Sequence, residues 1–194
     1  MKRIIIGISG ASGAVYGIRA LEILKDNPEI ETHLILSRAG KLTIEIETAW
    51  QIKDIQALAS VNYSEKEIGA AIASGSFQTA GMLIAPCSIK TLSAVANSYA
   101  DNLLTRAADV QLKEGRPVVL MVRETPLHPG HIRLMGLAAD NGAVIFPPVP
   151  ALYSQPKSVD EIISATVGRA LSRLGIDNPE YPRWEGRMPG GKDR

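Results

Sequence analysis

The fold of this chain is decided by the stretch Arg3-Ile4-Ile5-Ile6-Gly7-Ile8-Ser9-Gly10-Ala11-Ser12-Gly13. Its first half is a continuous apolar run, which is typical of a strand covered on both faces within a parallel sheet. Its second half is a glycine turn, after which apolar residues recur at helical spacing, at positions 15, 18, 21 and 24. The pattern predicts a strand, a turn and a helix that ends near residues 26–28.

The alternation of strand and helix patterns continues along the chain. Further strands are expected at 32–36, 82–85, 117–122 and 143–146. Helices are expected at 38–48, 89–97, 103–114, 131–140 and 158–175. This order predicts an α/β fold of the Rossmann-like or flavodoxin-like class, a three-layer αβα sandwich with a doubly wound, mainly parallel sheet. The ligand of such a sheet lies beyond the carboxyl ends of its strands. Residues 63–76 carry the weakest pattern, and we expect a surface loop there.

Composition limits the size class, the partners and the location of the protein. With 194 residues, 45% of them apolar, the chain is long enough for one core, so we expect a single domain over 1–175 and an extended arm over 176–194. The net charge of +1 favours neither nucleic acid nor an anionic membrane as a partner. One cysteine, no signal-peptide pattern and no apolar run of membrane-spanning length predict a cytoplasmic protein. The aromatic content of 5% predicts a modest core and therefore an oligomer.

Two turns at the predicted sheet edge are suited to an anion. Gly7, Gly10 and Gly13 precede a helix whose free backbone N–H groups and dipole favour negative charge. Their spacing matches neither common nucleotide motif, so a turn without a ligand stays open, and Ser12 is either a helix cap or a catalytic group. The strand ends at the same edge add hydroxyl groups and an ammonium group, on Ser37, Ser88, Lys90 and Thr91.

Cations follow the predicted strands and lie on one predicted helix. Arg106 and Lys113 are two helical turns apart, so both could face one anion, or both could simply be solvated. Arg169 and Tyr153 could join them, and Arg123 with Glu124 directly follows the strand at 117–122. These positions form a candidate phosphate site.

The single cysteine and the three histidines give little sign of a nucleophile or of a metal site. Cys87 has no histidine near it in sequence, and we expect it to pack rather than to act as a nucleophile. His33, His128 and His131 lack metal-site spacing with carboxylates or thiols, so no metal is predicted.

Several longer motifs resemble one known family, the UbiX-type flavin prenyltransferases, which include the Pad-type phenylacrylic acid decarboxylase subunits. The resemblance covers nearly the whole chain and rests on the glycine turn at 7–13, Ser74-Gly75-Ser76, Pro86-Cys87-Ser88, Ala100-Asp101-Asn102-Leu103, Arg106-Ala107-Ala108-Asp109-Val110, Leu112-Lys113-Glu114 and Arg123-Glu124-Thr125-Pro126-Leu127. Pro147-Pro148, Tyr153 and Arg183-Trp184 follow in the expected order.

The resemblance implies a homo-oligomer, a dodecamer of trimers, with FMN held where subunits meet. It implies transfer of a dimethylallyl group from dimethylallyl monophosphate to N5 and C6 of reduced FMN without a metal, and a UbiD-type decarboxylase that receives the prenylated FMN. By position, the FMN contacts would be Gly10, Ala11, Ser12, Ser37, Ser88, Ile89, Lys90, Thr91 and Arg123. The substrate contacts would be Arg106, Lys113, Arg123, Glu124, Tyr153, Arg169 and Trp184, and the catalytic groups Ser12, Glu47 and Glu124.

Prenyl transfer has two functional alternatives. An FMN-dependent cysteine decarboxylase would need a well-placed catalytic histidine, and only His33 lies near the second strand, within it. A subunit that merely carries FMN to a decarboxylase would leave Arg106, Lys113 and Arg169 solvated. The chain also departs from the family pattern, because Ile68-Gly69 stands where an aromatic residue is common, and the stretch 128–133 differs as well.

Overall fold

The isoleucine run forms β1 (Lys2–Ile8), a central strand of the sheet. A computed structural model describes residues 1–178, 181, 183, 184 and 186 of the chain. From Ile4 to Ile8 every residue of β1 is buried, as expected for a strand covered on both faces. The glycine turn follows it and leads into α1 (Ala14–Lys25).

The remaining elements alternate much as the pattern predicts. The strands are β2 (Ile30–Leu36), β3 (Val61–Ser64), β4 (Gly81–Cys87), β5 (Val118–Val122) and β6 (Val144–Ile145). The helices are α2 (Arg38–Glu47), α3 (Ile52–Gln56), α4 (Ile89–Ala96), α5 (Leu103–Lys113), α6 (Pro129–Asp140) and α7 (Val159–Ser172), with short 3-10 turns at η1 (Ala71–Ala73) and η2 (Leu152–Ser154).

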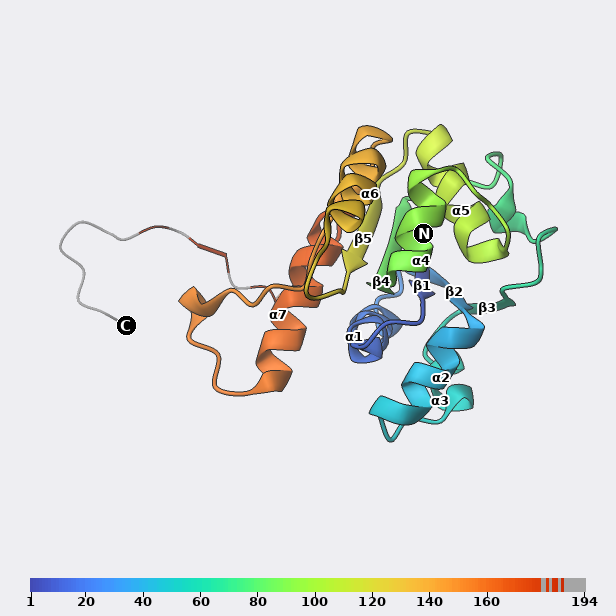
Figure 1. Cartoon of the computed structure of the whole chain (residues 1–194). Helices are drawn as coiled ribbons and strands as arrows, with labels where there is room; N and C mark the ends of the chain where they lie inside the picture. The colour runs from blue at the N-terminus through green and yellow to red at the C-terminus, as the bar shows by residue number, and fades with distance from the viewer. Residues whose placement is uncertain (179–180, 182, 185, 187–194) are drawn as a thin grey trace.

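The sheet order is β3-β2-β1-β4-β5-β6, and all of its described pairings are parallel. The chain therefore winds outward in one direction from β1 and in the other direction from β4 (Figure 1). This is the predicted doubly wound sheet, and the fold class is confirmed. The order reverses between β1 and β4, which is where a sheet of this kind opens a ligand crevice.

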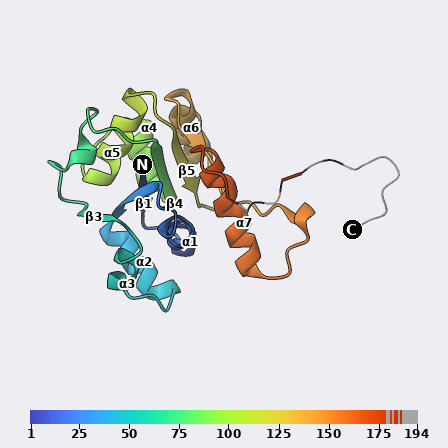
Figure 2. The same cartoon turned by 180° about the vertical axis from the view of Figure 1, so that it is seen from behind.

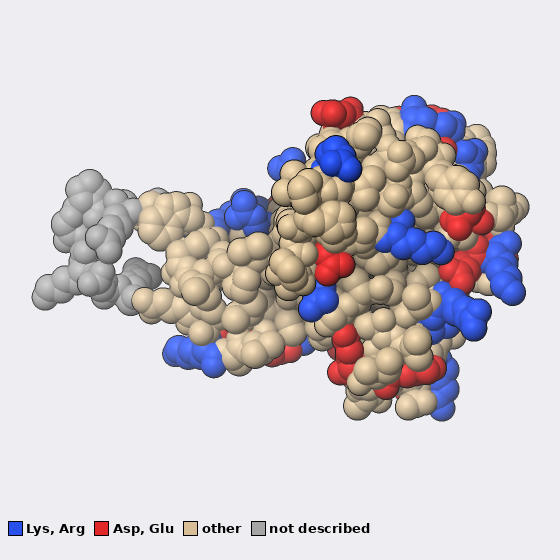
Figure 3. Space-filling model, in the orientation of Figure 1, with Lys and Arg blue, Asp and Glu red and all other residues tan. Residues whose placement is uncertain are grey.

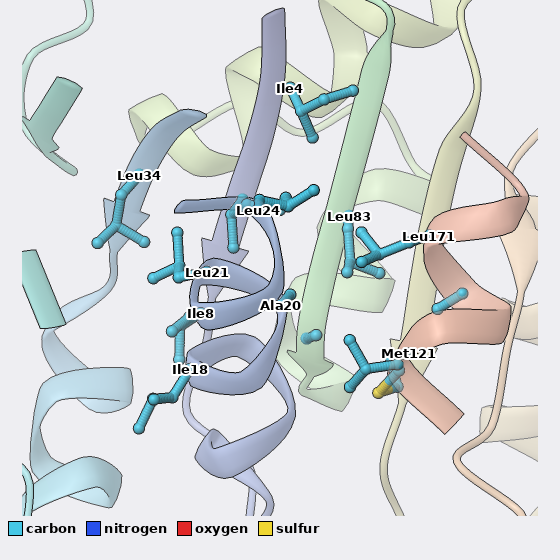
Figure 4. Packing of buried hydrophobic residues seen from close by; sticks show 14 of the residues in the cluster. Ile4, Ile8, Ile18, Ala20, Leu21, Leu24, Leu34, Leu83, Met121 and Leu171 are labelled. Carbon is cyan, nitrogen blue, oxygen red and sulfur yellow. The ribbon is translucent and has the colours of Figure 1, made fainter. Parts of the chain in front are cut away.

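Helices cover both faces of the sheet, so the core has two halves. On one face α1 and α7 pack over the sheet, and Ile8, Leu21, Leu83 and Leu171 belong to one buried cluster (Figure 4). On the other face α4, α5 and α6 cover the alternate residues of the same strands. Gly17 lets α1 come close to β4, because a Cβ there would lie 2.3 Å from the Ala85 carbonyl oxygen.

The expected number of five strands was wrong. Tyr63 and Ser64, the first two residues of the loop expected over 63–76, belong to a sixth strand, β3, and α3 was not foreseen. Over 65–76 the chain forms the expected loop, with the short turn η1 within it. The strand is only four residues long and lies at the sheet edge, where one neighbour suffices and its outer positions stay exposed. Such a segment has too few apolar residues to produce a clear pattern.

Beyond the core, the segment that contains η2 projects from the three-layer body, as both views show (Figures 1 and 2). Val149, Leu152 and Val159 in or beside it are exposed large apolar residues. The arm predicted over 176–194 lies partly outside the described residues. Among the helices that the structure describes, none is long and apolar enough to cross a membrane. Positive and negative side chains are interspersed over the face in Figure 3.

Candidate cofactor and substrate site

A cavity of about 520 Å³ opens at the point where the strand order reverses. The ends of β1, β2 and β4 reach it, and the starts of α2 and α4 form part of its wall. Its lining includes five of the predicted FMN contacts, Gly10, Ser37, Ser88, Lys90 and Thr91. Apolar side chains stand beside them, among them Leu42, Ala94 and Leu104. A wall of this mixed kind suits a ligand with a flat ring and an anionic group.

The glycine turn is held by an acidic side chain from another element. Gly13 is the N-cap of α1 in the left-handed region, with φ of 100°, and it offers no side-chain cap. The Gly13 N–H instead donates to Glu47 Oε2 at 2.8 Å. Glu47 is the last residue of α2, so the predicted catalytic carboxylate lies directly against the turn. Ser12 precedes the N-cap and does not cap α1, so the capping alternative for Ser12 was wrong.

Two hydroxyl groups of the cavity cap the helices that begin there. Ser37 Oγ accepts from the Gly40 N–H at 2.9 Å at the start of α2. Ser88 Oγ accepts from the Thr91 N–H at 3.3 Å at the start of α4 and donates to Thr91 Oγ1 at 3.1 Å. The starts of these helices concentrate N–H groups and positive dipole ends at one edge of the sheet, and this favours a phosphate there.

Ser9 is a residue of this region that the sequence pattern did not single out. It is 1% exposed and lies between the two turns. Its hydroxyl donates to the Pro86 carbonyl at 2.9 Å and accepts from the Ser88 N–H at 2.9 Å. One buried side chain therefore joins the glycine turn after β1 to the turn after β4. A serine inside a glycine-rich turn gives no sign of this, since the partner lies 79 residues away.

We expect Ser9→Ala to lower the free energy of unfolding by about 1–3 kcal/mol, because the Ser88 N–H loses its acceptor, while the Pro86 carbonyl keeps the Ser9 backbone N–H, which donates to it at 3.2 Å. We also expect it to raise the FMN dissociation constant about tenfold, because the two turns lose both side-chain hydrogen bonds between them and keep only the backbone bond from Ser9 to Pro86. Denaturant unfolding and a flavin fluorescence titration measure the two effects. The matched control is Ser164→Ala, which removes another buried hydroxyl, one that accepts from Arg19 at 2.8 Å. Unaltered FMN affinity in Ser9→Ala would contradict the expectation.

Arg123 and Glu124 follow β5 at the same edge of the sheet, and both are exposed. The Arg123 N–H donates to the Cys87 carbonyl at 3.1 Å, which places Arg123 beside the turn after β4. Burial raises the pKa of Tyr16 in the first turn of α1, and the nearby Arg123 guanidinium opposes that shift. Cys87 itself is fully buried, and its burial raises the pKa of its thiol well above the ordinary value. It packs in the core, as predicted.

The predicted phosphate contacts do not come together within one chain. Arg106 pairs with Asp109 at 3.0 Å and Lys113 with Glu114 at 2.6 Å, both on α5 or at its end. Tyr153 and Arg169 instead line a small cavity of about 30 Å³ beside α7. Because α5 and α7 cover opposite faces of the sheet, the sheet separates the two groups. Periodicity places a residue on a helix face, but it does not say which side of the sheet the helix covers.

The residues near α7 that include Tyr153 and Arg169 contact further aromatic side chains. The Tyr153 ring meets the Trp184 ring edge-on, with centroids 5.6 Å apart. Arg169 donates to the Tyr181 hydroxyl at 3.2 Å, and its guanidinium lies 5.8 Å from the centroid of that ring. Three of the predicted substrate contacts, Tyr153, Arg169 and Trp184, therefore belong to one aromatic and cationic cluster.

The histidines lie away from the cavity lining. His33 is buried in β2, where its Nε2 lies 2.8 Å from Glu31 Oε1 and its Nδ1 lies 3.0 Å from the Tyr63 hydroxyl. Burial lowers the pKa of His33, although Glu31 opposes the shift, and a neutral ring satisfies both contacts when Tyr63 donates to Nδ1. The rings of His128 and His131 lie against each other at the start of α6, tilted by 37° with their centroids 3.6 Å apart. Among the described residues, no group of three or more histidine, cysteine or acidic side chains could hold a metal.

The doubly wound sheet and the cavity at its reversal point define a nucleotide-binding type of protein, and the comparisons identify the nucleotide as a flavin. The pattern of the family called Flavoprotein matches residues 1–170, and the chain belongs to this family. Within it, the chain is 58% identical over 188 residues to "Flavin prenyltransferase UbiX" of Escherichia coli (strain K12), which covers 96% of this chain and 100% of that protein.

Two solved structures carry the same likeness. A dodecameric FMN-dependent UbiX-like decarboxylase from Escherichia coli O157:H7 matches with a TM-score of 0.92 and 43% identity, over 95% of this chain and 100% of that one. AnUbiX (PadA1), in complex with FMN and dimethylallyl pyrophosphate, matches with a TM-score of 0.93 and 41% identity, over 96% of this chain and 99% of that one. The resemblance predicted from the motifs is confirmed.

Proposed function

We propose that this protein is a flavin prenyltransferase, which transfers a dimethylallyl group from dimethylallyl monophosphate to reduced FMN. The observation that carries the proposal is the cavity at the reversal point of the sheet, in a chain 58% identical to a flavin prenyltransferase. The turn at 7–13, the cap of α2 and the start of α4 all contribute to that region.

The residues of the cavity fit FMN. Ser37, Ser88 and Thr91 supply hydroxyl groups beside two helix starts, as a phosphate requires, while Leu42 and Leu104 offer an apolar wall to the ring. Reduced FMN, when bound, supplies the electron-rich ring that accepts the prenyl group. Ser12 and the Oε2 atom of Glu47 would move the proton that this acceptor releases, with Glu124 at the same sheet edge.

The cations would act on the leaving group. When the bond between the allyl carbon and the phosphate oxygen breaks, the electron pair stays with the phosphate, and nearby cations stabilise it. Arg106 and Lys113 on α5 and Arg169 on α7 would supply this charge, with Tyr153 as a further donor. Trp184, in contact with Tyr153, would offer its indole face to the positive charge on the allyl group.

A complete site would then need more than one copy of the chain, because the two sets of cations lie on opposite faces of the sheet. We infer a homo-oligomer of the dodecameric kind known for the relative from Escherichia coli O157:H7. The exposed apolar residues Val149, Leu152 and Val159 support this, because their projecting segment has a surface to bury against a neighbour. The expected later partner is a UbiD-type decarboxylase that receives the prenylated FMN, and the expected location is the cytoplasm.

The decisive experiment incubates the purified protein with reduced FMN and dimethylallyl monophosphate and then measures the mass of the flavin. Addition of one five-carbon prenyl group supports the proposal. Recovery of unchanged FMN would favour a subunit that only carries the cofactor. Release of carbon dioxide from a peptide with a carboxyl-terminal cysteine would favour a cysteine decarboxylase, a function for which the positions of His33, His128 and His131 give no support.

Arg169→Ala is expected to weaken the binding of dimethylallyl monophosphate about tenfold and to leave FMN affinity unchanged, because a charge-assisted contact to the phosphate is lost. The measurement is a titration of the FMN-loaded protein with the monophosphate. Arg173→Ala is the matched control, since Arg173 is an exposed arginine one helical turn further along. An unchanged titration for Arg169→Ala would remove Arg169 from the substrate site.

A further inference from the structure

Arg116 holds a loop that has no regular secondary structure of its own. Its Nη2 donates to the Gly75 carbonyl at 2.7 Å, and its Nη1 donates to the Phe77 carbonyl at 2.9 Å. Nη1 also reaches Thr79 Oγ1 at 3.4 Å. One guanidinium group thus fixes three points of residues 75–79, just before β4. The planar fork of arginine suits this task, because its donors point in fixed directions.

A second contact ties the same loop to α5. The Thr79 hydroxyl donates to Gln111 Oε1 at 2.5 Å, and Gln111 is 1% exposed. Gln111 lies in the last turns of α5, and Arg116 follows the end of that helix by three residues. Side chains at the end of α5 and directly after it therefore both bind the loop.

Lys113 lies at the closest contact between the loop at 75–79 and the end of α5. A Cβ at Gly75 would lie 2.1 Å from Glu114 Oε1 and 2.9 Å from Lys113 Nζ, so the ion pair of Lys113 and Glu114 packs directly on the bare backbone of Gly75. The hydroxyl groups of Ser74 and Ser76, on either side of Gly75, lie 2.9 Å apart. Any shift of the loop would therefore move the surface against which the Lys113 ammonium group rests.

We propose that Arg116 is a positioning residue for the phosphate side of the substrate site. It acts through the loop: its hydrogen bonds keep Gly75 against the end of α5, and Gly75 keeps the Lys113 ammonium group in place. Arg116 does not contact the substrate, because its guanidinium is committed to the loop. The inference rests on the proposed function, in which Lys113 binds the phosphate of the allylic substrate.

The test is Arg116→Lys, which retains the charge and loses the fork. We expect KM for dimethylallyl monophosphate to rise about tenfold, with kcat and the FMN dissociation constant within about twofold of the unsubstituted protein. A purely structural role would lower the unfolding midpoint and FMN affinity instead. Arg173→Lys is the control, because it makes the same exchange at an exposed site directly after α7.

Gly75→Ala tests the same contact by changing the loop residue on which the Lys113 and Glu114 side chains pack. Its new methyl group would displace the flexible ends of Glu114 and Lys113 and would leave the side chain of Arg116 intact. We expect a similar rise in KM, so the inference stays testable if Arg116→Lys does not fold. Wild-type KM in both folded variants would overturn the positioning role and leave prenyl transfer standing. Absence of any prenylated flavin with the unsubstituted protein would overturn both proposals together.

Discussion

Glu47→Gln is expected to slow formation of the prenylated flavin about 100-fold or more while FMN stays bound. The side-chain amide of glutamine keeps an oxygen that can accept the Gly13 N–H, which now donates to Glu47 Oε2 at 2.8 Å. The glycine turn therefore keeps its support, and only the group that can take up and return a proton is lost. Removal of a general acid or base costs about 10²–10⁴ in rate. A single-turnover experiment, in which enzyme, reduced FMN and dimethylallyl monophosphate are mixed, measures the rate of formation of the prenylated flavin.

Two companion variants separate the chemical role of Glu47 from its structural one. Glu47→Ala removes the acceptor as well, so it should also lower the free energy of unfolding by about 1 kcal/mol, as loss of a helix cap does. Glu45→Gln makes the same exchange at an exposed position on the same helix and should leave the rate unchanged. A wild-type rate in Glu47→Gln would show that this carboxylate only supports the turn.

Gly10→Ala is expected to weaken FMN binding at least about tenfold, or about 1.4 kcal/mol. A Cβ at this position would lie 2.3 Å from the Ala39 Cβ, which is fixed to the backbone in the first turn of α2. Either the glycine turn or the start of α2 must shift to relieve this clash, and both border the cavity proposed for FMN. A flavin fluorescence titration measures the loss of affinity.

The contact can be tested from its other side. In the double variant Gly10→Ala with Ala39→Gly the clashing methyl group is gone, so a substantial part of the FMN affinity should return. Gly69→Ala is the control, because a Cβ there would meet nothing within 4 Å. If Gly10→Ala binds FMN as tightly as Gly69→Ala does, the close packing of the turn on α2 has no part in cofactor binding.

Local pattern was sufficient for most of the fold. The apolar run of β1, the stripe of α1 and the capping serine of α7 are each encoded within a few neighbouring residues, and the predicted elements follow from them. The strand β3 escaped because an edge strand of four residues needs few apolar side chains. Its ordering depends instead on long-range contacts, such as the one between Tyr63 and His33 at 3.0 Å.

The candidate site was predictable where its residues follow strands, because the carboxyl ends of parallel strands share one edge. Ser37 and Ser88 reach the same cavity for this reason. Ser9 and Arg116 were not predictable, since their importance lies in bonds to carbonyl groups far away in the chain, which no spacing encodes. The assignment of Lys113 and Arg169 to opposite faces of the sheet was equally hidden, because helix periodicity is the same on either side.

That separation of Lys113 from Arg169 has a genetic consequence. Under the proposed shared site, each subunit lends its α7 cluster to a reaction that takes place over the glycine turn of a neighbour. A chain with a substitution at Arg169 would then impair the reaction at the site of a neighbouring subunit and not the reaction at its own site. In an assembly mixed from chains lacking Arg169 and chains lacking Lys113, some sites would combine the intact Lys113 of the first kind of chain with the intact Arg169 of the second. Two alleles that each impair substrate binding alone would restore part of the activity when expressed together.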